Sequence, residues 1–374
     1  MQKYMRNLTI ICLVSLFLTA PINAMVKNYD KPAKGRWDFG LKEMWSIDRA
    51  GTNPLVAVQD IQVDDKGNIF FMDRKFRKIA AFDSNGKELV YFGKRGEGPG
   101  EVRRMVQFFL QGPNIIVEDR GGRLHYFSKK GKYAKTVCYN SRCEIKKFIG
   151  DSRFVSVLSN FGTKAEKENE NLEISDIKEK KSTVIASLKP EEVVQTSKGS
   201  GKDKIDFEVH VDELTPSVIV CTSGSSVFFG RNDHYIIKKT DFSGKELLSF
   251  SMEGRPAKTV SKKDKKGLLG SGVPPEVITD LVKGLPDQCT FFTKIHVDEK
   301  GFIYVYTPDI SKTNVREMDI FSPSGQYLYR STITLPRGLT PAAAPVFAGE
   351  HLYVFAEDEE GEGKLVKYKI NKIK

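Results

Sequence analysis

The side chains that usually carry catalysis are few and scattered in this sequence. Its five histidines, His125, His210, His234, His296 and His351, stand singly, without the H-x-x-x-H, H-E-x-x-H or H-x-H spacing that brings two imidazoles onto one metal. No P-loop, dinucleotide-binding or nucleophile-elbow motif occurs. The catalytic residues are therefore unknown from local spacing, and any site must be assembled by the fold from distant parts of the chain.

The spacing of the cysteines also gives no clear sign of a catalytic or metal site. Cys138, Cys143, Cys221 and Cys289 include no C-x-x-C pair, which argues against a structural zinc site. Cys138 and Cys143 can form a disulfide in an oxidising compartment if the residues between them turn, or they can stay reduced, and both alternatives are open. The apolar neighbours of Cys221 and Cys289 favour buried thiols.

One set of charged residues has types that suit ligand binding. Arginine holds carboxylates, phosphates and sulfates through paired hydrogen bonds, and short polar segments contain a candidate anion-binding set: Arg74, Arg77, Arg120, Arg123, Arg231 and His234. Whether this set forms one site depends on the elements that position it.

A repeat explains the high glycine content. Between residues 60 and 92, four apolar runs are joined by a turn at 64–67, a polar loop at 73–78 and a turn at 83–86. Asp and Asn hydrogen-bond their own backbone in tight turns, and Gly accepts the positive φ that such turns need. The segment therefore predicts a four-stranded antiparallel meander.

The same unit recurs along the chain with a period of about 45 residues, which is typical of a β-propeller. The glycine of the second turn reappears as Gly131, Gly244 and Gly325, and a degenerate copy has its turn at 176–181. A last unit begins at residue 351. These units predict an all-β fold, a six-bladed β-propeller of four-stranded antiparallel blades.

The last unit lacks a fourth strand. We expect the segment 41–47 to supply it and so to close the ring, which removes exposed strand edges. Residues 25–374 then form a single propeller with one insertion, 253–288. Within the insertion, residues 274–282 predict one short amphipathic helix that packs across the propeller. A helix that binds a partner is the alternative.

Three motifs resemble the NHL repeat: Asp-x-x-Gly-Asn-Ile-Phe at 64–70, Asp-Arg with Lys-Ile and Phe-Asp-x-x-Gly at 73–86, and Phe-Gly-Lys-Arg-Gly-Glu-Gly-Pro-Gly-Glu-Val at 92–102. The last is similar to a GxGxGPGEF-type loop of exported bacterial six-bladed propellers, with Val102 where Phe is more usual. The resemblance is strong for the first and fifth units. We interpret this loop as having a structural role, because three glycines and a proline force a tight crossing between blades.

In a propeller, the loops that join strands two and three share one face with the crossings between blades; we call it the loop face. The anion-binding set falls there, so we expect a binding or scaffold module for an anionic glycan, peptide or protein partner. The alternative is an enzyme: the resemblance includes calcium-dependent lactonases with a metal at the central channel, where Asp73, Asp119 and Asp309 would serve. Related amidating lyases place His where this chain has Phe76 and Gly121.

The N-terminus changes the meaning of the formal charge of +11. Lys3 and Arg6 precede an apolar run over 8–20 and Ala24, the layout of a cleavable secretory signal in residues 1–24. The run is shorter than the ~20 residues that span a bilayer. We therefore expect a periplasmic or extracellular protein, without a membrane span, monomeric and without a resident cofactor. Outside the cytoplasm, basic charge favours an anionic partner over nucleic acid.

Overall fold

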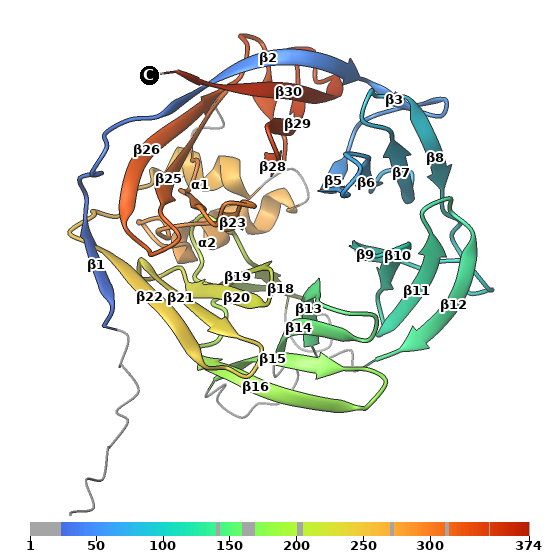
Figure 1. The fold of residues 1–374 in the computed structure, drawn as a ribbon, viewed down its shortest axis with the longest axis horizontal. Helices are drawn as coiled ribbons and strands as arrows, with labels where there is room; N and C mark the ends of the chain where they lie inside the picture. The colour runs from blue at the N-terminus through green and yellow to red at the C-terminus, as the bar shows by residue number, and fades with distance from the viewer. Residues whose placement is uncertain are drawn as a thin grey trace, which may run out of the picture.

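The computed structural model describes residues 24–139, 143–158, 169–199, 205–269, 273–310, 314–343 and 345–373. The predicted signal segment, 1–24, lies almost wholly outside these ranges. The fold is all-β, and its sheets stand in a ring around a central axis in a β-propeller arrangement (Figure 1). None of the helices within the described ranges is long and apolar enough to cross a bilayer.

Three sheets are four-stranded antiparallel meanders, whose strands follow one another in chain order. The first contains β5 (Val58–Val63), β6 (Ile69–Asp73), β7 (Lys78–Phe82) and β8 (Glu88–Phe92). The second contains β9 (Met105–Gln111), β10 (Asn114–Asp119), β11 (Arg123–Ser128) and β12 (Tyr133–Cys138). The third contains β13 (Cys143–Phe148), β14 (Arg153–Leu158), β15 (Glu170–Asp176) and β16 (Lys181–Leu188). Figure 1 shows the first strand of each sheet nearest the axis.

Two larger sheets complete the ring. One contains β19 (Val218–Ser223), β20 (Ser226–Arg231), β21 (Ile236–Asp241) and β22 (Glu246–Glu253), with β1 (Val26–Tyr29) added parallel to β22. The other has nine strands: β23 (Lys294–Val297), β24 (Ile303–Tyr306), β25 (Val315–Phe321), β26 (Tyr327–Thr334), β2 (Asp38–Ile47), β30 (Gly363–Ile373), β29 (His351–Glu357), β27 (Thr340–Pro341) and β28 (Val346–Ala348). A separate two-residue pair joins β3 (Arg49–Ala50) to β4 (Asn53–Pro54).

The glycine turns predicted from the repeat are confirmed. The amide of Gly67 donates to the carbonyl of Asp64, and Gly86 does the same to Asp83, each at positive φ. The equivalent glycines of the later units, Gly131, Gly244 and Gly325, repeat this geometry. In the degenerate copy Lys180 takes a φ of 55°, so a lysine occupies a conformation that favours glycine.

Ring closure by the N-terminal segment is also confirmed. β2 pairs antiparallel with β30 from Asp38 opposite Ile373 to Ile47 opposite Leu365. Trp45 of β2 donates its indole N–H to the carbonyl of Ser84 at 3.0 Å, in the first sheet. The two ends of the chain therefore form one sheet and fasten it to its neighbour.

Apolar faces of neighbouring sheets pack against each other around the ring. Phe70 and Met72 of β6 bury their side chains against Phe108 and Val117 of the second sheet. Phe71 and Phe82 pack against Tyr353 and Phe355 of β29 on the other side of the first sheet. Burial of such faces, at about 25 cal/mol per Å², is the main favourable contribution to folding.

The insertion holds two helices, so the prediction of one helix was incomplete. α2 (Pro275–Gly284) matches the predicted helix, whereas α1 (Lys262–Leu268) occupies the basic run before it. Ser261 and Asp264 form a reciprocal capping box that starts α1. The helices pack with a hairpin from the crossing before β19, made of β17 (Val194–Lys198) and β18 (Ile205–Val209), which the sequence did not predict.

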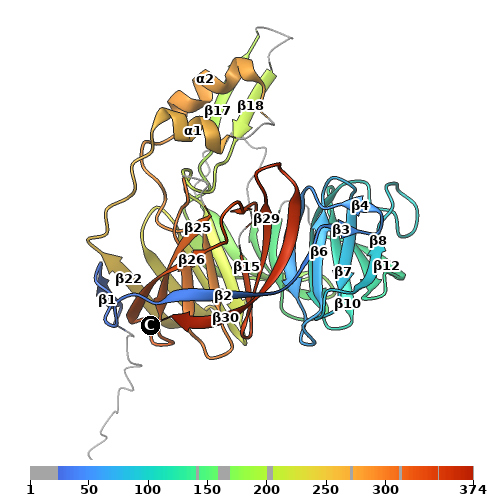
Figure 2. The ribbon, with the colours of Figure 1, turned by 90° about the horizontal axis from the view of Figure 1, so that it is seen from above.

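We call α1, α2, β17 and β18 the cap. It stands on one face of the ring (Figure 2) and has its own apolar core, in which Val277 and Leu281 of α2 are buried. Ile310, in the loop from β24 to β25, packs against that core. The cap therefore sits on the loop face.

Lys180→Gly is expected to raise the free energy of unfolding by about 0.5–1 kcal/mol. Glycine relieves the cost of the left-handed conformation, ~1–2 kcal/mol, and loses part of this gain to its larger unfolded-state entropy. Urea unfolding followed by tryptophan fluorescence measures the change. The control is Lys178→Gly in the same turn, where φ is not positive; it should lower the free energy of unfolding. Equal effects of both changes would contradict the explanation.

Candidate functional site

Two regions of the ring gather charged side chains: the loop face and the central channel. On the loop face, Arg74 and Arg77 lie in the loop from β6 to β7, and Arg120 and Arg123 lie at the turn from β10 to β11. Arg231 ends β20, and His234 follows it in the turn to β21. The six residues therefore belong to three different sheets.

Two of these arginines are held by internal ion pairs. Arg123 donates to Asp119 at 2.5 Å. The side chain of Arg231 is buried, donates to Glu192 at 2.6 Å and also pairs with Asp233. His234 is exposed and lies 3.1 Å from the same Asp233. Most of the charge of Arg123 and Arg231 is thus balanced within the fold.

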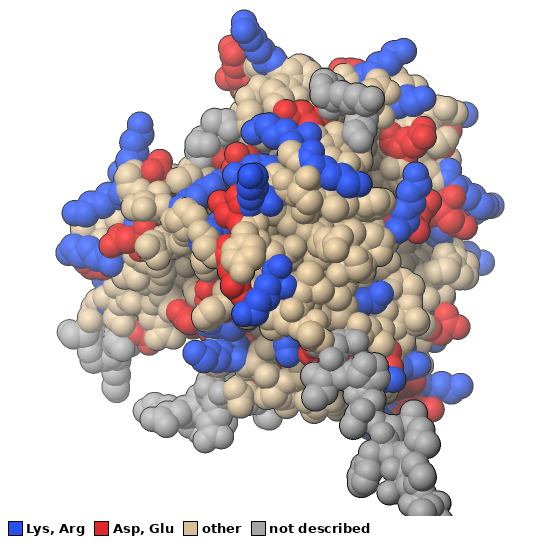
Figure 3. All heavy atoms as spheres, turned by 60° about the vertical axis from the view of Figure 1, so that its left-hand side comes forward, with Lys and Arg blue, Asp and Glu red and all other residues tan. Residues whose placement is uncertain are grey.

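The other three arginines of the predicted set are exposed and form no ion pair with another described residue, and the same is true of Arg95 and Arg104 in the crossing from β8 to β9. We call these five residues the arginine patch: Arg74, Arg77, Arg95, Arg104 and Arg120. Arg104 and Arg120 are neighbours, because the amide of Arg120 donates to the carbonyl of Arg104 at 3.0 Å. The side of the ring that bears β1 and β22 instead mixes basic with acidic side chains (Figure 3).

The glycine-rich crossing presents part of this patch. Glu101 folds back over the loop, with its carboxylate 2.5 Å from the ammonium of Lys94 and accepting the amide of Gly98 at 3.1 Å. A Cβ on Gly96 would stand 1.9 Å from that carboxylate, so a larger residue there would displace the Glu101 side chain. The close approach is intramolecular, and the neighbouring Arg95 is exposed.

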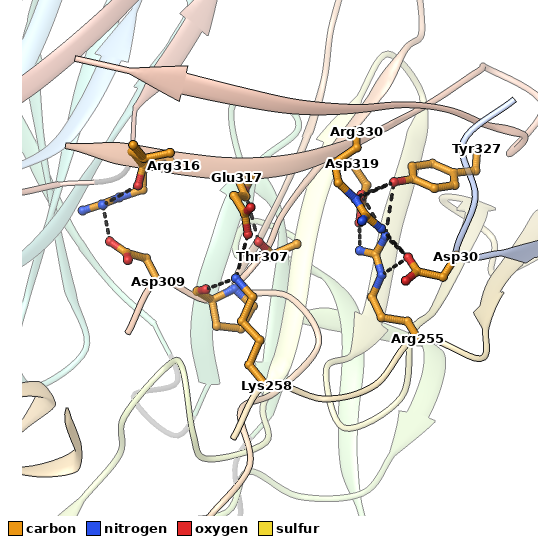
Figure 4. Close-up of polar contacts among 12 residues, drawn as sticks. Asp30, Arg255, Lys258, Thr307, Asp309, Arg316, Glu317, Asp319, Tyr327 and Arg330 are labelled. Carbon is orange, nitrogen blue, oxygen red and sulfur yellow. Dashed lines mark hydrogen bonds and ion pairs between the residues drawn. The ribbon is translucent and has the colours of Figure 1, made fainter. Parts of the chain in front are cut away.

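The three aspartates of the calcium alternative each close their own loop. Asp73 accepts the amide of Phe76 at 3.1 Å, and Asp119 accepts the amide of Arg104 at 2.7 Å. Asp309 pairs with Arg316, as Figure 4 shows. Within the described ranges, no three His, Cys, Asp or Glu residues are grouped as metal ligands.

The cap is anchored to the ring by a buried ion pair at the start of the insertion (Figure 4). Arg255 donates to both oxygens of Asp319 and to Asp30 of the N-terminal segment. Tyr327 donates its hydroxyl to Asp319 at 2.7 Å. Burial by itself lowers the pKa of Arg255, but the Asp319 carboxylate outweighs it and raises that pKa. The network therefore stabilises charged forms at the root of the cap.

The central channel holds charged residues that the sequence reasoning missed. A cavity of about 1150 Å³ runs along the inner strands and is lined by Lys147 of β13, Cys221 of β19 and Lys294 of β23, among others. Burial lowers the pKa of both lysines, and the nearby Cys221 sulfur acts in the opposite direction. Burial also raises the pKa of the Cys221 thiol, against which both ammonium groups act.

Asp60 is an acidic residue whose charge acts on Lys294. It has a φ of 51° at a bulge in β5 and lines a second cavity together with both lysines. The surrounding ring limits its hydration and raises its pKa to about 6, although Arg74 and Lys294 lower it. The signal in the sequence was weak, because single charges on inner strands look like those on any solvated strand face.

No family model matches the chain, and no curated protein matches it. Among solved structures, a DUF4221 family member from Bacteroides vulgatus ATCC 8482 is similar with a TM-score of 0.57 and 10% identity, covering 90% of this chain and 99% of the other. A protein from Bacteroides fragilis NCTC 9343, designated as exported, is similar with a TM-score of 0.53 and 12% identity, covering 94% and 99%. At these identities the likeness shows the fold alone.

Cys138 and Cys143 do not form a disulfide in the structure. Cys138 ends β12 and Cys143 begins β13, so they belong to different sheets.

His210 stabilises the crossing that leads from β16 into the cap and back to β19. Its ring lies 2.9 Å from Glu191 and 3.1 Å from Asp212. Burial by itself lowers the pKa of His210, but the hydrogen bonds to Asp212 and Glu191 raise it to about 10. Because the folded pKa exceeds the unfolded value of ~6.5, the stabilisation is complete below that pH and disappears as the pH rises to about 10.

His210→Gln is therefore expected to lower the free energy of unfolding by about 2 kcal/mol at pH 6, the value for hydrogen bonds to charged groups. The difference from the wild type should shrink steadily between pH 7 and 10. Urea unfolding at pH 6, 8 and 10 measures it. His234→Gln, at an exposed histidine, is the control and should change little. A pH-independent loss in His210→Gln would contradict the assigned ion pairs.

Proposed function

We propose that this protein is an exported, six-bladed, NHL-like propeller that binds an anionic glycan, peptide or protein partner through its loop face. The count of six is supported by the nine-stranded sheet, in which a single parallel pair, Phe39 with Ile333, joins β2 to β26. Dividing the sheet there yields β23–β26 and a second unit of β28, β29, β30 and β2. With the other four sheets this makes six blades.

Export is supported by the layout of residues 1–24 and by the designation of the similar protein from Bacteroides fragilis. In the periplasm or outside the cell, acidic glycans and acidic peptides are the abundant polyanions. A binding module for them needs basic side chains that are not neutralised from within. The arginine patch has this property.

The observation that carries the proposal is the contrast between two groups of arginines on one face. Arg123 and Arg231 donate hydrogen bonds to carboxylates within the protein. Arg77 and Arg120 are exposed and have no ion pair among the described residues. An exposed guanidinium keeps its paired donors available for a carboxylate or sulfate of the partner. Arg123 and Arg231 then stabilise the loops of the same face through their internal ion pairs.

The double change Arg77→Glu with Arg120→Glu should weaken binding to immobilised dextran sulfate and to polyglutamate on the order of tenfold. Each reversal removes an attractive contact and adds a repulsive one. Retention is measured as the salt concentration of elution, and affinity by biolayer interferometry. Neutral dextran serves as the uncharged matrix.

The matched control is Lys42→Glu with Lys369→Glu, which alters net charge equally on exposed residues of β2 and β30 that lie opposite each other. Retention of this variant should stay close to that of the wild type. If both double variants lose the same retention, the binding reflects overall charge and the assignment to the loop face is wrong.

A further inference from the structure

We propose that the central channel is a second binding site, for an organic carboxylate with an apolar body, and that Lys147 and Lys294 hold its carboxylate. The site is separate from the arginine patch. It is built by the inner strands of the ring rather than by the loops.

Three neighbouring sheets supply its polar groups. Lys147 comes from β13, Cys221 from β19 and Lys294 from β23, and these sheets follow one another around the ring. The two lysines line both the 1150 Å³ cavity and a cavity of about 560 Å³ that continues toward the loop face. They therefore mark the junction of the two spaces, at a point where both ammonium groups influence the Cys221 sulfur.

The two ammonium groups have no ion-pair partner among the described residues. Neither lysine forms an ion pair with a described residue; Lys294 donates to the carbonyl of Pro345 at 3.3 Å, and its ammonium lies 5.6 Å from the centre of the Tyr306 ring. Lys146, in contrast, pairs with Glu144 at 2.6 Å. Restricted hydration without an ion-pair partner is unfavourable for a cation, so a bound anion would relieve a cost that the fold compensates only in part, through Asp60.

The charged groups around the junction do not supply that anion. Asp60 has a mostly ionised carboxylate at pH 7, because its pKa is about 6, but it acts on Lys294 and Arg74 together and forms no ion pair with Lys294 among the described residues. Glu118 accepts hydrogen bonds from Gln107 and Tyr139 in its own sheet. Asp212, in the smaller cavity, is paired with His210.

The apolar lining of the cavity indicates what the ligand must contain besides its carboxylate. The cavity beside the lysines is lined by aliphatic side chains of several inner strands, among them Ile61, Val63, Leu110, Val220 and Val297. Charged residues of the turns after β5 and β11, such as Asp64 and Lys129, complete the lining. A small inorganic anion would leave these walls in contact with water. A carboxylate with a hydrocarbon body would cover them and gain about 25 cal/mol per Å² of apolar surface removed from water. The combination indicates an amphipathic organic acid.

Cys221 is a built-in reporter of this site, because its thiol lines the same cavity. We would measure its modification by two methanethiosulfonate reagents of similar size, the anionic sulfonatoethyl and the cationic trimethylammonioethyl compound, in a Cys138→Ser background. The lysines should make the anionic reagent faster by about tenfold after correction for a free thiol. Octanoate should slow the modification, whereas octanamide and inorganic phosphate should not.

Lys147→Met with Lys294→Met should abolish both the reagent preference and the protection by octanoate. Lys42→Met with Lys369→Met, with the same change in net charge, should leave both intact. Protection by octanoate is read on the unaltered lysines, so it remains decisive if the double variant fails to fold.

Equal protection by phosphate would overturn the organic-acid assignment, and absence of protection by octanoate would overturn the site. Retention on dextran sulfate, which reports the arginine patch, should be the same with and without octanoate. The two proposals can therefore fail independently.

Discussion

The pairing of β2 with β30 is the interaction on which the rest of the structure depends. Each sheet packs only against its two neighbours, so the ring is only as stable as its weakest contact between neighbouring sheets, which we call a seam. The last unit has three strands of its own, and the N-terminal segment supplies the fourth, since β2 pairs over its full length with residues 365–373 of β30. Tyr353 and Leu365 on one side and Val366 and Tyr368 on the other belong to the apolar clusters of both flanking seams. The added strand also covers the edge of β30 that would otherwise be open.

The segment before β2 forms further contacts that join the N-terminal part of the chain to neighbouring sheets. Asn28 is buried and donates its side-chain amide to the carbonyls of Ser251 and Gly325, in two neighbouring sheets. Asp30 then joins the Arg255 and Asp319 network at the root of the cap. Charge is treated in two ways within one ring: Arg255 is paired with two carboxylates, whereas Lys147 and Lys294 line the channel without an ion-pair partner among the described residues. A fully paired charge is suited to anchoring the cap, whereas a cation without an ion-pair partner is suited to binding an anionic ligand.

The parts of the fold that could be predicted from the sequence are those with local causes. A turn such as Asp83–Gly86 depends on one side-chain carboxylate and one glycine φ, both contained in four residues. The strands alternate around it, and the repeat of the pattern implies a ring. The hairpin of β17 and β18 and helix α1 were missed, because their polar sequences resemble loops and are held by contacts with α2. The basic run of α1 needed Ser261 and Asp264 to be read as a helix start.

The candidate sites show the same division between features with local causes and features set by distant residues. The sequence by itself determined that arginines collect in the loops of the first two units, since loop position follows from the order of strands. Only the tertiary structure decided which of them are free: Arg231 is neutralised by Glu192, a residue from another crossing, while Arg77 is not. It also placed Lys147 and Lys294, far apart in the chain, beside one cavity. Turns are set by neighbours along the chain, whereas charge balance and hydration are set by neighbours in space.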